Sequence, residues 1–431
     1  MTNFFPEKPA EKKQIYLDHA ATTYMDSEVK AAIDPYFSDM FANSSGLYAI
    51  GRQSREAVDT SRRIVADTLG TQVDTIIFTS GGTESDNMAI FGVALHKKIA
   101  QLKQITKEKK GHIITTKMEH HAVLHPCEEL EKQGFEVTYL VPNEEGFVSA
   151  KQVRDALRED TILESVMYAN NEIGTVMPIA DIGREILKWR KTHATKYPYF
   201  HTDACQTPGA LQLDVEKLHV DLMSLNGSKM YGPKGIGMLY KRRGVDLKPL
   251  MYGGGQEMRL RAGTENVPLI VGFGKALEMA QAGREKENKR LQELRAYFWQ
   301  ELQQKIPKIR LNGPALDDAH TRLPNNLNIS ILDVEGEALL LYLDEYGIIC
   351  STGSACTSES LDPSHVLLAC GLPYEYAHGS LRFTLGKRNT RSDIDYVMTY
   401  LPFIVEKLRE ISPVNLQYNP KENKHAQYLQ R

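Results

Sequence analysis

A lysine at the end of an apolar run is the first candidate for chemistry. Lys229 follows residues 222–225, which predict a short buried strand, and it stands among glycine, serine and proline. A lysine amine whose pKa is lowered by nearby positive charge is nucleophilic and can form a Schiff base. Asn226 and Ser228 could donate hydrogen bonds to a phosphate beside it. Composition alone does not choose between Lys229 and Lys234, and a basic surface loop is the other interpretation.

Cys356 is a second candidate nucleophile. It stands in segment 351–358 (STGSACTS), whose small polar side chains offer too little apolar surface to anchor them. We therefore expect a mobile loop with an exposed thiol, and exposure favours reactivity. An incidental loop cysteine is the alternative. The chain has five irregularly spaced cysteines and no CxxC pair, so we expect neither a disulfide framework nor a metal site.

Residues 78–85 (FTSGGTES) could bind an anion between a strand and a helix that starts near Asp86. Gly82 lets the backbone approach a ligand, and Thr83 adds a hydroxyl. The first N–H groups of a helix and its dipole favour phosphate at such a place. An ordinary glycine-rich turn is the alternative, because short glycine motifs are weak evidence.

Three charged or titratable side chains follow or interrupt predicted strands. Asp203 comes directly after residues 199–201 and could pair with a cationic ring nitrogen of a cofactor; a helix N-cap is the alternative. Arg382 lies inside an apolar strand and needs a partner, either a substrate carboxylate or a structural acid. His120 could stack on a planar ring or shuttle protons, or it could be structural.

These side chains need a scaffold that brings strand ends together. Apolar or β-branched runs alternate with helical patterns through the first two thirds of the chain. The predicted strands are 113–115, 136–140, 165–168, 199–201 and 222–225, and the predicted helices between them include 123–133, 151–158 and 182–191. This alternation predicts an α/β fold with a mostly parallel sheet flanked by helices, whose ligands lie beyond the carboxyl ends of the strands.

The pattern changes near residue 268. A long charged helical stretch, 269–302, precedes strands at 327–331 and 380–385 and helices at 335–346 and 391–411. We expect a second, smaller α+β domain here, carrying the polar loop 351–362.

The overall composition excludes some classes of protein. The 431 residues suggest more than one domain, and the net charge of −3 gives no electrostatic footprint for nucleic acid. No apolar run approaches the ~20 residues of a membrane helix, and the first residues lack the apolar core of a secretory signal. A reducing cytoplasm suits the cysteine pattern.

Taken together, the segments resemble the cysteine desulfurases of the NifS/IscS type, within the class V aminotransferases and the fold-type I pyridoxal-phosphate enzymes. The resemblance runs from residues 15–23 (IYLDHAATT) to about Pro413, and it includes residues 170–174 (NNEIG), 231–235 (YGPKG) and 261–266 (RAGTEN). It implies a large domain over residues 31–275 with a sheet of the seven-stranded type. Residues 1–30 and 276–431 would form the small domain.

The resemblance also implies a role for each candidate residue. It makes Lys229 the covalent anchor of pyridoxal 5'-phosphate and Cys356 the sulfur acceptor. The ring contacts would come from His120, Asp203 and Gln206, the phosphate contacts from Gly82, Thr83, Asn226 and Ser228, and the substrate carboxylate contacts from Asn171 and Arg382. Thr264 would reach the phosphate of the neighbouring subunit, which implies a homodimer.

The implied reaction converts L-cysteine to L-alanine and leaves a persulfide on Cys356. The partner would be a sulfur acceptor protein such as an iron–sulfur scaffold. Ser228 stands where the family often has histidine, which affects the phosphate contacts, and residues 411–415 match the scaffold-docking tail only in part. The alternatives are a class V aminotransferase, which needs no loop cysteine, a selenocysteine lyase, and an inactive dimeric partner.

Overall fold

The computed structural model describes residues 13–102, 105, 110–316, 318, 320–352 and 362–416. The larger part of the molecule is built on a seven-stranded sheet in the order β2-β8-β7-β6-β5-β3-β4. The strands are β2 (Ile76–Thr79), β3 (His112–Thr116), β4 (Glu136–Leu140), β5 (Thr161–Ser165), β6 (Tyr199–Asp203), β7 (Leu222–Asn226) and β8 (Gly237–Lys241). Only β8 runs antiparallel to its neighbours. The predicted α/β class is therefore confirmed.

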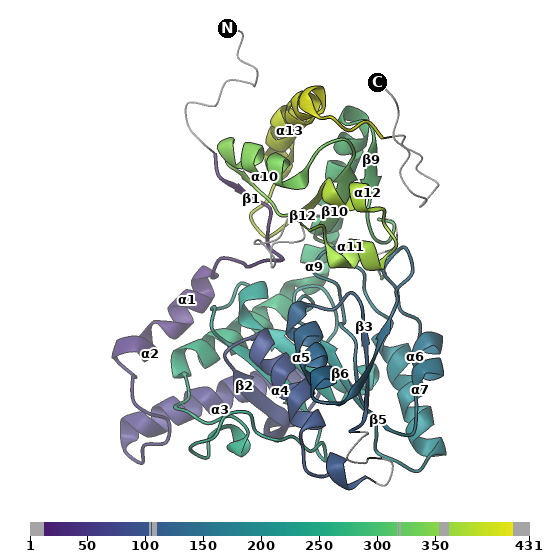
Figure 1. Cartoon of the computed structure of the whole chain (residues 1–431). Helices are drawn as coiled ribbons and strands as arrows, with labels where there is room; N and C mark the ends of the chain where they lie inside the picture. The colour runs from purple at the N-terminus through teal and green to yellow at the C-terminus, as the bar shows by residue number, and fades with distance from the viewer. Residues whose placement is uncertain are drawn as a thin grey trace.

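Helices cover both faces of this sheet, so its inner strands are buried on both sides (Figure 1). One face packs on α4 (Gly82–Ala94) and α5 (His121–Lys132). The other packs on α3 (Ala49–Leu69), α7 (Ile179–Thr192) and the first part of α9 (Val267–Lys305). Parallel sheets need this double cover, and it leaves the strand ends as the open edge for ligands.

The strand predicted at 165–168 is wrong in its position. The structure has β5 at Thr161–Ser165, ending where the predicted strand begins. Glu164 interrupts the apolar run in the sequence, yet its side chain is fully buried inside the sheet. Burial raises the pKa of Glu164 well above its ordinary value, so the neutral carboxyl is favoured there.

A smaller second part surrounds a three-stranded antiparallel sheet in the order β12-β10-β9. Its strands are β9 (Ile309–Leu311), β10 (Asn326–Ile331) and β12 (Ser380–Thr384), packed with α10 (Gly336–Glu345) and α13 (Arg391–Ile411). Two short helices, α11 (His365–Ala369) and α12 (Tyr374–His378), precede β12.

Two segments tie the parts together (Figure 1). Helix α9 has 39 residues; its first part lies in the core of the large sheet and its last part in the core of the small one. The predicted boundary after residue 275 falls inside this helix. The short strand β1 (Ile15–Tyr16) pairs in parallel with β11 (Ile348–Ile349), so β1 belongs to the small part. No helix of the described residues is long and apolar enough to cross a membrane.

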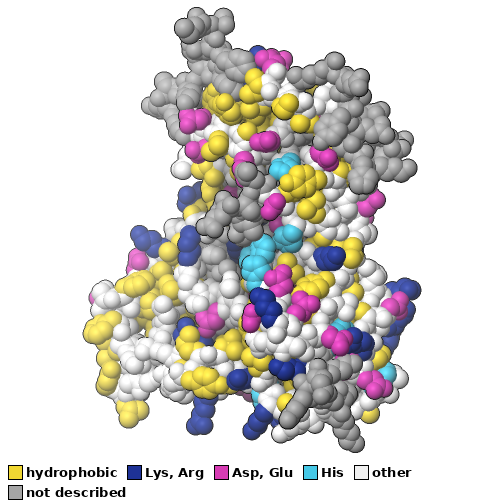
Figure 2. Space-filling view, in the orientation of Figure 1, with side chains coloured by type: hydrophobic (Ala, Val, Ile, Leu, Met, Phe, Trp, Pro, Cys, Tyr) yellow, Lys and Arg dark blue, Asp and Glu magenta, His cyan; other side chains and the backbone are white. Residues whose placement is uncertain are grey.

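Histidines gather on the face shown in Figure 2, where α5 meets α11. The ring of His121 lies 4.8 Å, centroid to centroid, from His125 and also from His365. His365 Nε2 lies 3.0 Å from the backbone oxygen of Glu119, which joins α11 to the large sheet. The described residues contain no group of three or more side chains arranged to hold a metal ion.

Candidate active site

Lys229 lies directly beyond the carboxyl end of β7, in a single 3-10 turn over Gly227–Lys229. The side chain of Asn226 caps this turn by accepting from Ser228 N at 3.1 Å. The Lys229 amine donates to the backbone oxygens of Ala20, at 2.8 Å, and of Ala21. The turn at the end of β7 and the carbonyls of the segment after β1 therefore jointly fix the position of the amine.

Gln206 joins Lys229 at the same carbonyl, since its Nε2 donates to Ala20 O at 3.0 Å. Lys234, the competing candidate, donates to Thr23 O at 3.3 Å instead. Two predicted site residues thus meet at one point of the segment 18–21, and Lys234 contacts a different residue.

The predicted anion site lies beyond the end of β2, which β8 separates from β7 in the sheet. Helix α4 starts at Gly82 with Gly81 as its N-cap, and no side chain caps its first N–H groups. A Cβ built on Gly82 would lie 2.6 Å from Cys205 Sγ and 3.6 Å from Asn226 Cβ. Only glycine lets the helix start approach β7 this closely. An uncapped helix start beside hydroxyl and amide side chains fits a phosphate.

Asp203 ends β6 and is nearly buried, with Oδ1 accepting from Cys205 N at 2.9 Å. Two more titratable groups lie behind it: His201 Nε2 is 3.5 Å from Asp86 Oδ1, and both side chains are buried. Burial, and then the charge of Asp203, raise the pKa of Asp86 to about 6. Such an acidic, desolvated place favours a cation, which fits a protonated ring nitrogen.

His120 is the N-cap of α5, and its Nδ1 accepts from Ala122 N at 3.1 Å. Burial lowers the pKa of this imidazole. A backbone N–H pointing at Nδ1 favours the neutral tautomer with its proton on Nε2. His120 can therefore donate a hydrogen bond through Nε2 while its other nitrogen stays committed to the helix.

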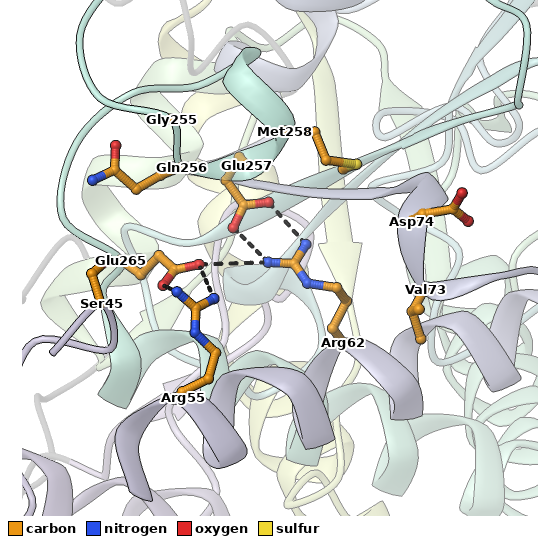
Figure 3. Close-up of a pocket in the computed structure, with 10 residues that line it drawn as sticks. All are labelled: Ser45, Arg55, Arg62, Val73, Asp74, Gly255, Gln256, Glu257, Met258 and Glu265. Carbon is orange, nitrogen blue, oxygen red and sulfur yellow. Dashed lines mark hydrogen bonds and ion pairs between the residues drawn. The ribbon is translucent and has the colours of Figure 1, made fainter. Parts of the chain in front are cut away.

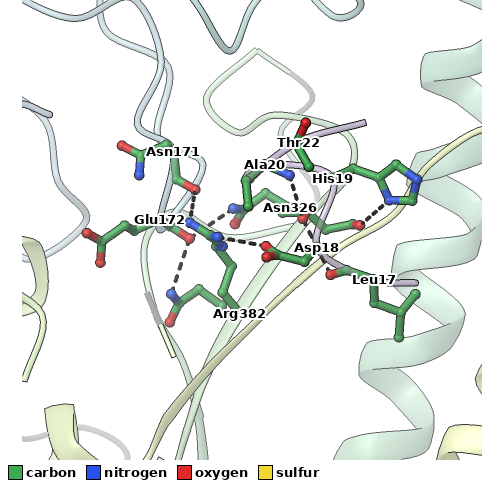
Figure 4. A network of polar contacts seen from close by, with 12 residues as sticks. Leu17, Asp18, His19, Ala20, Thr22, Asn171, Glu172, Asn326 and Arg382 are labelled. Atoms are coloured by element: carbon green, nitrogen blue, oxygen red, sulfur yellow. Dashed lines mark hydrogen bonds and ion pairs between the residues drawn. The ribbon is translucent and has the colours of Figure 1, made fainter. Parts of the chain in front are cut away.

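Arg382 lies in the middle of β12 with its guanidinium buried (Figure 4). Nη2 donates to Asp18 Oδ1 at 2.7 Å, and Nη1 donates to the backbone oxygen of Asn171 at 3.1 Å. Nε is buried without a hydrogen-bond partner among the described residues. The structure thus brings Asn171 and Arg382 together, through the carbonyl of Asn171.

The sequence analysis missed residues 18–21 as part of the site. Asp18 contacts Arg382, and the carbonyls of Ala20 and Ala21 contact Lys229. These residues appeared only as part of a family motif. An aspartate and a histidine directly after a short apolar strand were the signal that could have marked them, since charge there needs a buried partner.

Thr264 is exposed. Its segment is held to the first turn of α4 by the ion pair between Arg261 Nε and Glu84 Oε1, at 3.1 Å. Beside it lies a cavity of about 560 Å³ lined by two arginines and two glutamates (Figure 3). Arg62 donates to both carboxylate oxygens of Glu257, at 2.7 and 2.9 Å.

The predicted sulfur acceptor, Cys356, lies outside the described residues. The chain leading toward it is held to β12, because Ser351 N donates to Arg382 O at 3.1 Å and Ser380 Oγ donates to Thr352 O at 3.1 Å. Three of the other cysteines, Cys127, Cys205 and Cys370, are buried. Burial raises the pKa of Cys370 to about 12 and raises those of Cys127, Cys205 and Cys350 as well, which disfavours the reactive thiolate in all four.

Comparison with known proteins agrees with this arrangement. Residues 15–397 match the family described as aminotransferase class-V. The chain is 50% identical over 402 residues to cysteine desulfurase IscS of Clostridium botulinum strain Hall, covering 93% of this chain and 97% of that protein. It is also 50% identical over 412 residues to cysteine desulfurase IscS of Methanosarcina thermophila, covering 96% of each.

Solved structures give the same result. A NifS-like protein superposes with a TM-score of 0.79 at 34% identity, covering 93% of this chain and 99% of that one. A structure described as SspA in complex with cysteine has a TM-score of 0.72 at 37% identity, covering 86% and 98%. The chain belongs to the class V aminotransferase family of pyridoxal-phosphate enzymes and, within it, to the cysteine desulfurases.

Proposed function

We propose that this protein is a cysteine desulfurase that converts L-cysteine to L-alanine and transfers the sulfur to its own Cys356. The observation that carries the proposal is the 50% identity to IscS desulfurases over almost the whole chain. The position of Lys229 at a strand end, beside an uncapped helix start and a buried aspartate, supports it independently.

The chain offers a partner for each part of pyridoxal 5'-phosphate. Its phosphate would lie at the start of α4, against Gly82, Thr83, Asn226 and Ser228. Asp203 would face the ring nitrogen, and Gln206 and His120 would contact the ring. When bound, the cofactor supplies an electron sink for negative charge that develops on the substrate α-carbon.

Different side chains of the protein then act on different groups of the substrate. Arg382 binds the carboxylate through the N–H donors that make no hydrogen bond within the described part of the chain. The Lys229 amine takes the α-proton. It lies at the point where Gln206 and the segment 18–21 meet. His120 donates through Nε2, because the start of α5 occupies its Nδ1.

The sulfur step requires a thiolate. The sulfur of Cys356 bonds to the substrate sulfur, and the bond between that sulfur and the substrate β-carbon breaks. Its electron pair stays with the carbon, which is later protonated as alanine leaves. The neutral thiol is a poor nucleophile, so this cysteine must lose its proton first. A reducing compartment such as the cytoplasm would preserve the thiol.

The proposed dimer would complete the phosphate site through Thr264. Large apolar side chains stay exposed just before α1 (Ser27–Ile33), on α2 (Pro35–Ser38), between α2 and α3, and in the segment after β8. They are Met25, Phe37, Phe41, Leu47, Tyr48, Met251, Tyr252 and Met258. An apolar patch of this kind marks a protein interface, and a second copy of the chain is the occupant we propose. The sulfur would pass on to an acceptor such as an iron–sulfur scaffold protein.

Replacement of Cys356 tests the proposal most directly. Cys356→Ser should keep the cofactor but release at least a hundredfold less alanine from L-cysteine, because a hydroxyl is a far weaker nucleophile at neutral pH. Mass spectrometry of the wild-type protein after cysteine treatment should find one extra sulfur, about 32 Da, on the Cys356 peptide. Cys370→Ser is the matched control and should keep the adduct. Near-normal alanine release from Cys356→Ser would contradict the proposal.

A further inference from the structure

The contacts of Arg382 assign a role to a residue outside the predicted site. A guanidinium has five N–H donors in one plane, and a carboxylate bound to it takes the direction of whichever donors remain. In this structure Nη2 donates to Asp18 and Nη1 to the carbonyl of Asn171, while Nε is buried without a partner among the residues described. The protein therefore uses two of the five N–H donors in these contacts, and Nε–H and one further N–H on each Nη remain.

We propose that Asp18 is a positioning residue that orients Arg382, so that the N–H donors which the protein leaves unused are directed at the substrate carboxylate. The inference rests on the proposed function, because it takes Arg382 as the carboxylate anchor. An arginine held on one side by an acid and on another by a carbonyl has a defined plane. Without Asp18 the same side chain could turn, and the carboxylate could bind where Asp18 now lies.

Asp18 itself is held in place by β12. The backbone N–H of Thr384 donates to Leu17 O at 2.7 Å, and its hydroxyl accepts from Ala20 N at 2.9 Å. The hydroxyl of Tyr16 donates to the carbonyl of Asp18, at 3.0 Å, and lies 2.9 Å from that of Thr22. These contacts hold the backbone on both sides of Asp18, which limits how far its carboxylate can follow Arg382 if the arginine moves.

The position of Asp18 also connects the two ends of the substrate. Its own segment supplies the carbonyls of Ala20 and Ala21 to the Lys229 amine. Lys229, which would take the α-proton, and Arg382, which would bind the carboxylate, therefore both contact the segment 18–21.

A second ion pair provides the matched control. Asp26 Oδ2 lies 2.9 Å from Lys387 Nζ, and this pair joins the same two regions of the chain away from Arg382. Asp26 also caps α1 by accepting from Glu28 N. Asparagine preserves such a cap, so Asp26→Asn removes an ion pair between the two parts without touching the carboxylate anchor.

The test compares Asp18→Ala, Asp18→Asn and Asp26→Asn, each loaded with cofactor. Asparagine can still accept from Nη2, whereas alanine cannot. Asp18→Ala should lower kcat/KM for L-cysteine at least tenfold, and Asp18→Asn and Asp26→Asn less than threefold. Binding should be followed through the cofactor absorption, with L-alanine as a carboxylate ligand and cysteamine as an analogue that lacks the carboxylate. Asp18→Ala should weaken L-alanine at least tenfold and cysteamine less than twofold.

The outcomes separate the inference from the proposed function. Wild-type protein that forms no alanine from cysteine would refute the proposed function. Normal wild-type turnover with equal losses in Asp18→Ala and Asp18→Asn, or equal weakening of L-alanine and cysteamine, would overturn the role of Asp18 alone. Thermal unfolding of each variant checks that all three fold.

Discussion

Lys229 and Lys234 differ in what their amines contact, and the sequence could not show this. The Lys229 amine meets Ala20 and Ala21 beside Gln206, whereas the Lys234 amine donates only to Thr23 O among the contacts described. Both lysines follow the same strand. The choice between them therefore depends on a segment about 200 residues away in the chain, at a separation of 209 residues for Ala20.

Lys229→Ala should abolish alanine formation and leave no cofactor that borohydride can fix to the protein. Lys234→Ala should keep both, because its amine contacts Thr23 O and none of the residues proposed to hold the cofactor. Peptide mapping after borohydride reduction is the measurement. A label on Lys234 would show that the wrong lysine was assigned.

The contact between Gly82 and Cys205 makes a paired prediction. Gly82→Ala would place a Cβ 2.6 Å from Cys205 Sγ, which pushes the start of α4 away from β7. We expect at least a tenfold loss of cofactor affinity, because the first N–H groups of the helix would no longer face the phosphate. Removing the sulfur in Gly82→Ala/Cys205→Ala should restore most of it. Cofactor affinity can be measured by titration of the absorbance, and a double variant no better than Gly82→Ala would contradict this account.

At the scale of elements, the sequence predicted the helices and strands whose patterns extend over a few neighbouring residues. The alternation of apolar strands and helices predicted the parallel sheet, and residues 269–302 predicted most of α9. The prediction failed at β5, where the acidic residue Glu164 is buried inside the strand. The partner of Arg382 could not be predicted either, because Asp18 reaches it across a separation of 364 residues.

The contact between α5 and α11 predicts a dependence of stability on pH. Burial, followed by the charges of His365 and His125, lowers the pKa of His121 to about 4. The unfolded chain binds a proton at this histidine below its ordinary pKa of about 6.5, and the folded chain does not. Stability is therefore lost as the pH falls from about 6.5 toward 4.

His121→Gln should reduce the loss of stability as the pH falls, since glutamine takes up no proton. The measurement is the Tm at several pH values between 7 and 4.5, with the exposed His193→Gln as control. The control should keep the wild-type slope. An unchanged slope in His121→Gln would show that the histidine cluster does not titrate on unfolding.

At the scale of the whole molecule, the exposed apolar patch predicts the state of assembly. Leu47 is 89% exposed and Phe41 69%, which is costly for side chains that face water permanently. The pair Phe41→Glu/Leu47→Glu should convert a dimer into a monomer, as measured by light scattering. Thr264→Val should keep the dimer and weaken cofactor retention several-fold. A monomeric wild-type protein with full activity would refute both expectations.

The pairing of Asp18 with Arg382 has a consequence for the order in which the protein matures. Chains grow at roughly 5–20 residues per second, so the arginine leaves the ribosome on the order of half a minute after the aspartate. During that time the strand Ile15–Tyr16 has no partner, because β11 is also made late. The large sheet can form first, but the pocket that would hold the substrate cannot close until the last strand is synthesised. A nascent chain would thus be kept from starting sulfur chemistry before it is almost complete.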